Sequence, residues 1–536
     1  MTPVAAGVAP SALPSPAPPA ATATGATPSP PAETAQQRGM RRAWVLGAAG
    51  VSLIATVQAL RDPDVWWHLA VGNLIRAHGI PSHEPFTFLG APNPWIGQQW
   101  GYEVLLSFMF GVGAWLPMLV MGLVASAAFV VAVRSAPRSL RVPGPFLAGG
   151  LLLSVVVAGT FVGVRGQVIT LLGTAITLWV LARWREGSVR ALWALPPLFL
   201  LWANLHAGFI TGFGVILLVA LTVAVWRRIR PGVEPAARLR PLLVAAAIGA
   251  IATLLNPAGV HLYPYILDTF TNPTLTSNIT EWLPPDFHLT ALRIFEIEAV
   301  LLVVLWVLSR RPDPIDVVLG IATLAASLQA QRNVAVFAVV AAPQVARYGW
   351  LVWISWQQRP RVAAFSRPRP ALPALMLAAV VTAAAVVAHV VPISRASAVS
   401  QDMAHNWPVA AADYVAAHDA GQRMYSLYEW GGYLADRFPT QRTVYIYGES
   451  AVFGSDRLQQ YLDIHLVRPD WRSQLEDPRM TVAIVPAASQ EATAFLEIGW
   501  TTQCHDAASD AVVMHASTLG VGPAHTPPDP RSAPSC

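Results

Sequence analysis

Apolar runs of about 20 residues recur along this chain from Ala43 to Pro392. Charged residues make up 12% of its 536 residues and hydrophobic residues 54%, whereas soluble domains are about 25% charged. A soluble fold could not cover so much apolar surface, but a bilayer core about 30 Å thick is spanned by about 20 apolar residues in a helix. The sequence therefore predicts an α-helical polytopic membrane protein.

The apolar runs predict about eleven transmembrane helices. Their ranges are 43–60, 114–133, 146–163, 168–182, 191–203, 209–226, 241–256, 296–309, 315–330, 334–353 and 372–391. If the first helix enters from the cytoplasm, cytoplasmic loops hold twenty Arg residues and external loops six, as the positive-inside rule requires. We expect residues 100–110 to lie on the membrane surface or to insert only partly, because a further span there would invert everything downstream.

Three regions flank or follow this multi-span domain, which we place at 38–395. Residues 1–37 are rich in Pro, Ala, Ser and Thr and lack the apolar core of a cleavable signal peptide, so they predict a disordered cytoplasmic tail. Residues 400–516 alternate between helix-like and strand-like patterns and predict a small soluble α/β domain outside the membrane. The Pro-rich residues 517–536 predict a second disordered tail. Within the α/β domain the expected helices are 408–419, 455–465 and 488–498, and the expected strands are 423–427, 443–447, 480–485 and 510–515.

Composition excludes several chemistries. All 35 basic residues are Arg, so the chain has neither the Lys of a Walker A loop nor a Lys amine for a Schiff base. The net charge of +5 comes from Arg clusters between apolar runs, which indicates topology, and nucleic acid is not an expected partner. Cys504 and Cys536 allow at most one disulfide and match no metal-ligand spacing.

The first external loop, residues 61–100, is the most unusual polar stretch. Asp62 and Asp64 lie at the mouth of the first span, and residues 65–77 predict an amphipathic surface helix anchored by Trp66 and Trp67. A plain structural interpretation makes Asp64 the N-cap of this helix and leaves Asp62 solvated.

Polar side chains in the other external loops are predicted on the same membrane face. Each one, taken singly, is more often a helix cap or an interfacial residue than a ligand, but their confinement to one face indicates a site for a sugar phosphate. They are Arg165, Gln167, Asn204, His206, Asn256, His261, Glu281, Arg332 and Asn333.

The loop motif Asp-x-Asp-x-Trp-Trp-His-Leu, formed by Asp62, Asp64, 66–67, His68 and Leu69, resembles that of a bacterial group of GT-C-like membrane proteins. The GT-C glycosyltransferases include protein O-mannosyltransferases, aminoarabinose transferases and oligosaccharyltransferases. The resemblance covers most of residues 43–350. It implies a polyprenyl-phosphate-sugar donor and an integral protein of the bacterial cytoplasmic membrane, with the C-terminal domain outside.

The resemblance also implies roles for residues. In such enzymes an Asp of this loop is the catalytic base, here Asp62 or Asp64; most relatives with a lipid-phosphate monosaccharide donor have adjacent Asp and Glu, whereas here Pro63 intervenes. The segment 429–433 resembles the acceptor motif of oligosaccharyltransferases but lacks its Asp, so recognition of an acceptor sequon is not expected. The expected substrate-binding residues are Trp67, His68, Glu84, Arg165, Gln167, Asn204, His206, Asn256, Glu281 and Arg332, and those on the acceptor side are Glu429, Trp430 and Tyr433.

An external transfer site implies a mechanism. Nucleotide sugars are cytoplasmic, so we expect a lipid-linked donor of a hexosyl or pentosyl group and a glycan, lipid or protein acceptor. A carboxylate would deprotonate the acceptor hydroxyl, while Arg165 and Arg332, with His68 or His206, would contact the leaving phosphate. Alternatively, the Asp pair would hold a divalent cation, Mg²⁺ or Mn²⁺.

Two other classes of function remain open from the sequence, and within the enzyme class a polysaccharide polymerase or ligase also remains open. A transporter or lipid flippase also needs many spans, but such proteins place ionisable residues near the midplane, and the span centres here are nearly free of charge. A non-enzymatic envelope protein would need far fewer spans as an anchor.

Overall fold

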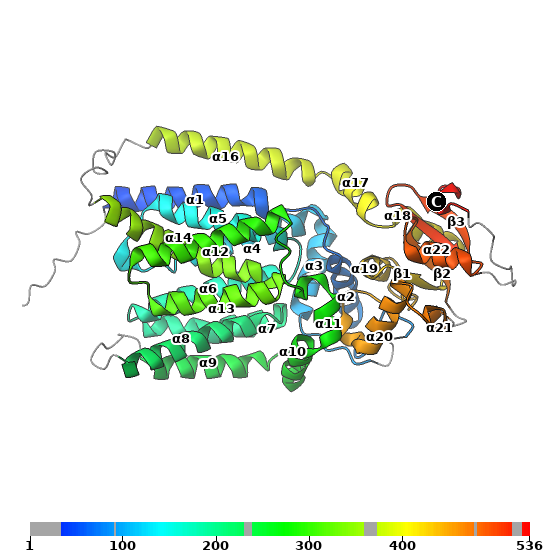
Figure 1. Ribbon diagram of the computed structural model, residues 1–536, viewed down its shortest axis with the longest axis horizontal. Coiled ribbons are helices and arrows are strands. Elements are labelled where there is room, and N and C mark those ends of the chain that lie inside the picture. The colour runs from blue at the N-terminus through cyan, green and yellow to red at the C-terminus, as the bar shows by residue number, and fades with distance from the viewer. Residues whose placement is uncertain (1–33, 90–92, 230–237, 358–371, 476–479, 517–527) are drawn as a thin grey trace, which may run out of the picture.

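The computed structural model describes residues 34–89, 93–229, 238–357, 372–475, 480–516 and 528–536. A bundle of roughly parallel and antiparallel long helices occupies one half of the molecule, and a smaller domain with a sheet lies beyond one end of it (Figure 1). Short helices fill the layer between the two. The expected tails fall largely on residues 1–33 and 517–527, which lie outside the described residues.

The long helices of the bundle follow the predicted runs closely. They are α1 (Ala35–Thr56), α4 (Trp115–Val133), α5 (Gly144–Ala158), α6 (Gln167–Arg185), α7 (Leu195–Leu205), α8 (Phe209–Ile229), α9 (Leu239–Thr253), α12 (Thr290–Ser309), α13 (Pro314–Gln329), α14 (Val334–Gln357) and α16 (Leu372–Ile393). The first helix begins earlier than predicted, at Ala35, because Thr34 and Gln37 form a reciprocal capping box.

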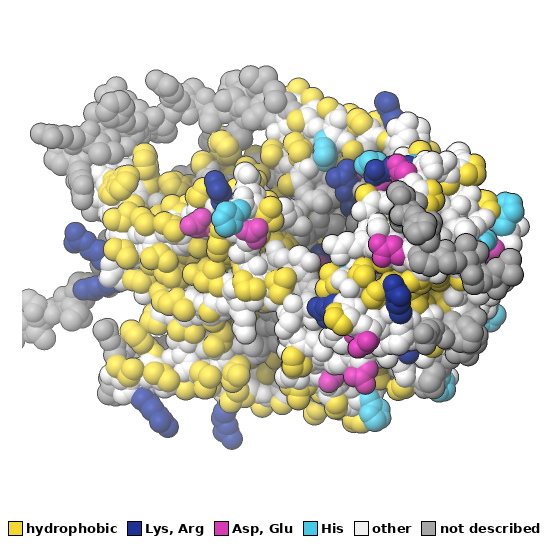
Figure 2. Space-filling view, turned by 45° about the vertical axis from the view of Figure 1, so that its right-hand side comes forward, with side chains coloured by type: hydrophobic (Ala, Val, Ile, Leu, Met, Phe, Trp, Pro, Cys, Tyr) yellow, Lys and Arg dark blue, Asp and Glu magenta, His cyan; other side chains and the backbone are white. Residues whose placement is uncertain are grey.

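The helical membrane fold with a small α/β domain is confirmed, but the count of eleven spans is not. Among the described residues, five helices are long and apolar enough to cross a membrane, and a bent pair made by the end of α16 and α17 (Ala396–Asn406) would bring the number to six. Four shorter apolar helices include α3 (Trp100–Val112). On the face shown in Figure 2, hydrophobic side chains cover most of the bundle, and Arg side chains project from its left and lower edges.

The first loop forms α2 (Asp64–His78) and, with α3, α10 (Leu262–Thr271) and α11 (Pro273–Asn278), fills the layer between the bundle and the small domain (Figure 1). The predicted N-cap was wrong. Pro63 holds that position, and Asp64 is the first helical residue. Asp62 takes over part of the capping, because its Oδ1 accepts the backbone N–H of Asp64 at 2.9 Å.

The small domain contains one four-stranded sheet in the order β1-β2-β4-β3. The first pair of strands is parallel, and the other two pairs are antiparallel. The strands are β1 (Arg423–Ser426), β2 (Met480–Pro486), β3 (Thr501–Asp506) and β4 (Ala511–His515), and the helices are α18 (Val409–His418), α19 (Tyr428–Arg437), α20 (Ser450–His465), α21 (Trp471–Leu475) and α22 (Gln490–Glu497).

Two expectations for this domain were wrong. The predicted strand 443–447 is extended chain whose ladder contacts are single bridges from Val444 to Met424 and Thr87. The expected disordered tail 517–536 contains an ordered end, where Cys536 forms a disulfide with Cys504 in β3 and its backbone pairs with His505. This disulfide ties the end of the chain to the edge strand.

Candidate active site

A cavity of about 700 Å³ lies where the loops of the bundle meet the small domain. We call it the site cavity and define it by its charged lining residues. These are Arg61, Asp62, Asp64, Arg165, Glu281, Arg332, Glu429 and Glu449, together with His68, His206 and His465. Six residues from five separate external loops, which the sequence assigned to one membrane face, therefore line one space: Asp62, Asp64, Arg165, His206, Glu281 and Arg332.

A buried guanidinium joins two of the acidic residues. Nε of Arg165 forms an ion pair with Oδ2 of Asp62 at 2.7 Å, and Nη2 of the same side chain pairs with Glu281. Burial opposes the charge on Arg165, but the two carboxylates outweigh it and raise the pKa of Arg165 above its ordinary value. Burial likewise acts to raise the pKa of Glu281, but Arg165 and Arg332 hold it below its usual range. Arg165 therefore already has two acidic partners and positions Asp62.

Asp64 lies in a different electrostatic environment. Its Oδ1 accepts the indole N–H of Trp67 at 3.0 Å, and the structure gives it no direct ion pair within the described residues. Burial, followed by the negative charges of Asp62 and Glu281, raises the pKa of Asp64 to about 7. A carboxylate with a pKa near neutrality can exchange a proton at working pH, which suits a general base.

Two of the three histidines of the cavity, His206 and His68, are held neutral. Burial, with the charge of Arg332 next in size, lowers the pKa of His206 to about 3. Its Nδ1 accepts the backbone N–H of Gly208 at 3.0 Å, which leaves the proton on Nε2 as a donor. His68 is buried beside Glu103, with 3.3 Å between its Nδ1 and Oε1 of the carboxyl group, and burial lowers the pKa of His68.

Arg332 differs from Arg165 in keeping its donors available. Within the described part of the chain its guanidinium makes no ion pair or hydrogen bond; it stacks on the ring of Trp282 at 4.4 Å. Gln167 fixes the backbone there, because its Nε2 donates to the carbonyl of Arg332 at 2.7 Å. The adjoining wall is apolar and is formed by Ile266, Phe270, Leu275, Ile279 and Trp282. A cation beside an apolar wall fits a phosphate that carries a lipid chain.

Three predicted binding residues do not line the site cavity and instead brace its walls. Glu84 is fully buried and accepts hydrogen bonds from two backbone amides, Thr87 Oγ1 and the hydroxyl of Tyr447. Oδ1 of Asn204 accepts the indole N–H of Trp100 at 2.7 Å, and Nδ2 of Asn256 donates to the carbonyls of residues 98 and 203. These polar groups satisfy the backbone of the loops, as buried polar groups generally must.

The predicted acceptor-side segment packs against α2 as part of helix α19. Glu429 lines the cavity, whereas Trp430 and Tyr433 are buried away from it, with the ring of Tyr433 edge-on to Trp66 at 5.6 Å. A Cβ on Gly431 would lie 1.9 Å from the carbonyl oxygen of Ile446. The glycine is therefore needed for close helix packing and not for a tight turn.

Of the cavity wall that the small domain contributes, the sequence predicted only Glu429. Glu449 accepts a hydrogen bond from the hydroxyl of Tyr265, and burial raises the pKa of Glu449 to about 7. Tyr428, Tyr461 and His465 complete this wall. No spacing marked these residues, because they come from α19, α20 and the loop before α20, and only the docking of the small domain brings them to the cavity.

The acidic residues do not fit the expected divalent cation. Asp62 is engaged at both oxygens, by the N–H of Asp64 and by Arg165, and Glu281 is paired with the same guanidinium. Among the described residues, no group of three or more His, Cys, Asp or Glu side chains has the arrangement of a metal site. The positive charge at the centre of the acidic cluster is supplied by Arg165.

No protein-family profile and no curated protein matches the chain. Two solved structures are similar to it over 92% of its length. One is the archaeal oligosaccharyltransferase AglB from Archaeoglobus fulgidus, in complex with an inhibitory peptide and a dolichol-phosphate, at 12% identity over 76% of that chain with a TM-score of 0.46. The other is ArnT from Cupriavidus metallidurans bound to undecaprenyl phosphate, at 14% identity over all of that chain with a TM-score of 0.45.

Proposed function

We propose that the protein is a membrane glycosyltransferase that moves a sugar from a polyprenyl-phosphate donor to an acceptor hydroxyl at the extracytoplasmic face of the membrane. The observation that carries the proposal is the meeting of Asp64, Arg165 and Arg332 in one cavity beside an apolar wall. These are the parts that such a transfer needs: a base, a cation for the leaving phosphate and a surface for the lipid.

Arg332 binds the donor phosphate in this proposal. Its guanidinium has five N–H donors in a planar fork, and the described part of the chain supplies none of them with an acceptor. His206, neutral with its proton on Nε2, adds a donor without adding charge. As the bond from the anomeric carbon to the phosphate oxygen breaks, the phosphate gains negative charge, and these fixed donors stabilise it.

Asp64 removes the proton of the acceptor as the acceptor attacks the anomeric carbon. Asp62 has a different task, because its contact with Arg165 fixes the position of that cation and keeps negative charge beside Asp64. The acceptor enters from the side of Glu429 and Glu449, where the small domain forms the wall. Tyrosine rings at this wall offer stacking surfaces for a sugar.

The proposed orientation has the small domain outside the cytoplasm. The positive-inside distribution supports it, and so does the disulfide between Cys504 and Cys536, since disulfides persist in oxidising compartments. The donor must then be a carrier lipid that has already crossed the membrane.

Proteoliposomes that contain the purified protein and a polyprenyl-phosphate monosaccharide labelled in the sugar test this function. The expected result is transfer of label to a water-soluble or lipid acceptor, with release of the polyprenyl phosphate. Movement of the labelled lipid between leaflets without cleavage of the sugar-phosphate bond would instead identify a flippase.

A further inference from the structure

A second cavity, of about 570 Å³, lies at the end of the helix bundle far from the small domain. We call it the distal cavity; its charged lining consists of Arg185, Glu186, Arg311, Asp313, Asp316 and Arg347. Its volume is within the range of about 300–1,000 Å³ that is usual for small-molecule sites. The function proposed above does not use it.

Helix α6 runs from the site cavity to the distal cavity, so its length indicates where the distal cavity lies across the membrane. Gln167, the first residue of α6, lines the site cavity, and Arg185, the last, lines the distal one. A helix of 19 residues is about 28 Å long, which is close to the thickness of a hydrocarbon core. The distal cavity therefore lies at the head-group level of the opposite membrane face.

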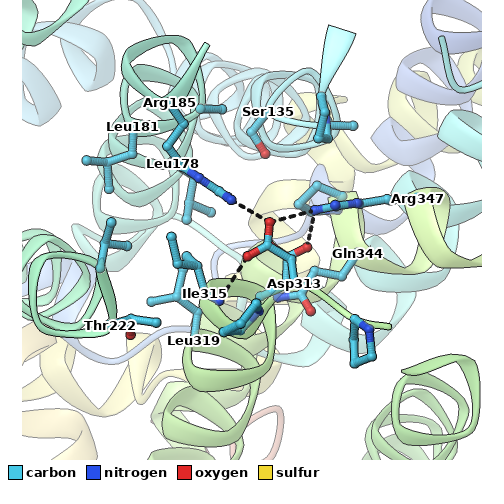
Figure 3. A pocket seen from close by; sticks show the side chains of 18 of the residues that line it. Ser135, Leu178, Leu181, Arg185, Thr222, Asp313, Ile315, Leu319, Gln344 and Arg347 are labelled. Carbon is cyan, nitrogen blue, oxygen red and sulfur yellow. Dashed lines mark hydrogen bonds and ion pairs between the residues drawn. The ribbon is translucent and has the colours of Figure 1, made fainter. Parts of the chain in front are cut away.

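Ion pairs connect helices α6, α13 and α14 at the mouth of the distal cavity (Figure 3). Arg185 and Arg347 approach Asp313 from opposite sides, and Nη1 of Arg347 also donates to Oδ2 of Asp316 at 2.6 Å. Two donors and one acceptor remain within the described residues: Nε of Arg347 is buried without a partner, Arg311 makes no ion pair, and the bonds of Asp316 to Arg347 and Tyr348 both use its Oδ2 and leave its Oδ1.

The rest of the lining is mostly apolar and comes from the bundle interior. It includes Leu178, Leu181, Val219, Val223, Leu319 and Val340. A purely structural ion network would need no such apolar space beside it, because apolar side chains otherwise pack without voids. The combination of a charged mouth at head-group depth and an apolar interior matches an amphiphile.

The charge balance selects the kind of head group. Three Arg residues face three carboxylates around the cavity, so the lining is neutral overall but carries both signs. An anionic head group would gain from the Arg residues and lose against the carboxylates, whereas a head group with a phosphate and an ammonium can pair with both. Asp313 is engaged at both oxygens, by the N–H of Ile315 and by the two Arg side chains. We propose that the distal cavity binds a zwitterionic phospholipid with a primary ammonium group, its phosphate at Arg311 and its ammonium at Oδ1 of Asp316.

Native mass spectrometry of the full-length, delipidated protein in detergent tests this inference, with phosphatidylethanolamine and phosphatidylglycerol of identical acyl chains as probes. We expect phosphatidylethanolamine to bind about tenfold more tightly, which corresponds to about 1.4 kcal/mol. Arg311→Gln should weaken its binding about tenfold. Arg310→Gln removes the same charge from the neighbouring exposed residue, which does not line the cavity, and should change nothing.

A second pair of variants separates the cavity from lipid that merely surrounds the bundle. Thr222→Phe fills the distal cavity without touching an ion pair, because the Thr222 hydroxyl bonds only within its own helix. Val225→Phe adds a similar ring at an exposed position of the same helix. Loss of the bound lipid in Thr222→Phe alone supports the proposal. Equal binding of both lipids by the unaltered protein, no binding, or the same behaviour in both Phe variants would overturn it.

Discussion

Arg165 and Asp62 lie 2.7 Å apart, guanidinium Nε to carboxylate Oδ2, in contact across two loops at one end of the helix bundle. The two loop carboxylates therefore have different roles. Asp62 is engaged by Arg165, whereas Asp64 has no ion pair within the described residues and has a pKa near neutrality, as a general base requires. Five predictions follow from this division and from the packing of the small domain on the first loop.

Arg165→Met should lower stability by about 3–5 kcal/mol, because it leaves Asp62 and Glu281 buried without their shared cation. The matched control is Arg61→Met, whose side chain is 72% exposed and pairs with Asp402; an exposed pair contributes about 0–1 kcal/mol. Thermal unfolding of both variants in the same detergent measures the difference. Equal shifts of the unfolding temperature in the two variants would mean that the ion pairs of Arg165 do not stabilise the fold more than an exposed pair does.

The rate of transfer should rise with pH through about 7, because Asp64 must be ionised to accept a proton and its pKa is raised to about 7. Initial rates at saturating donor, from about pH 5 to about pH 9, give the profile. Asp402→Asn, at a carboxylate outside the cavity, should leave the profile in place. A rate that is flat across this range would show that no group with such a pKa acts as the base.

Glu449→Gln should make stability less dependent on pH. The pKa of Glu449 is raised from 4.5 to about 7 in the folded protein, so the folded state holds a proton that the unfolded chain releases. This stabilisation is fully present below pH 4.5 and is lost as pH rises through about 7. Unfolding temperatures of the two proteins should converge at low pH and separate toward neutrality, with the variant more stable there; parallel curves would argue against a raised pKa.

Gly431→Ala should loosen the docking of α19 on the chain that follows it, because the new Cβ would lie 1.9 Å from the carbonyl oxygen of Ile446. Gly421→Ala is a poor comparison, since that glycine has a positive φ. Gly149→Ala is better, because nothing lies within 4 Å of its added Cβ. Limited proteolysis should cut the small domain of the Gly431 variant faster than that of the Gly149 variant, and equal rates would contradict the packing argument.

The residues that the sequence located best are those fixed by local chain constraints. Asp64 begins helix α2, and Asp62, Arg165 and Arg332 each lie two residues before the start of an α-helix at one face of the bundle, so topology alone predicted that they share a face. Whether a side chain on that face lines a cavity depends on long-range packing. The side chain of Asn256 donates hydrogen bonds to backbone carbonyls of two other segments. The sequence of its own loop does not distinguish this structural role from contact with a substrate.

The small domain shows the same limit. Residues 443–447 have the β-branched and aromatic pattern of a strand, but their position places them beside the first loop, so they pair by single bridges and not as a ladder. The wall formed by Glu449 and Tyr461 depends on how α20 docks against the layer of short helices. Neither outcome follows from propensity, because tertiary contacts decide both.

The most direct test of the account is sugar transfer by Asp64→Asn in proteoliposomes with a labelled polyprenyl-phosphate donor. The substitution keeps an acceptor for Trp67 but removes the base. The account predicts a rate lower by about 10²-fold or more, with donor binding retained and with Asp402→Asn as active as the unaltered protein. Full activity of Asp64→Asn would contradict the assignment of Asp64 as the base.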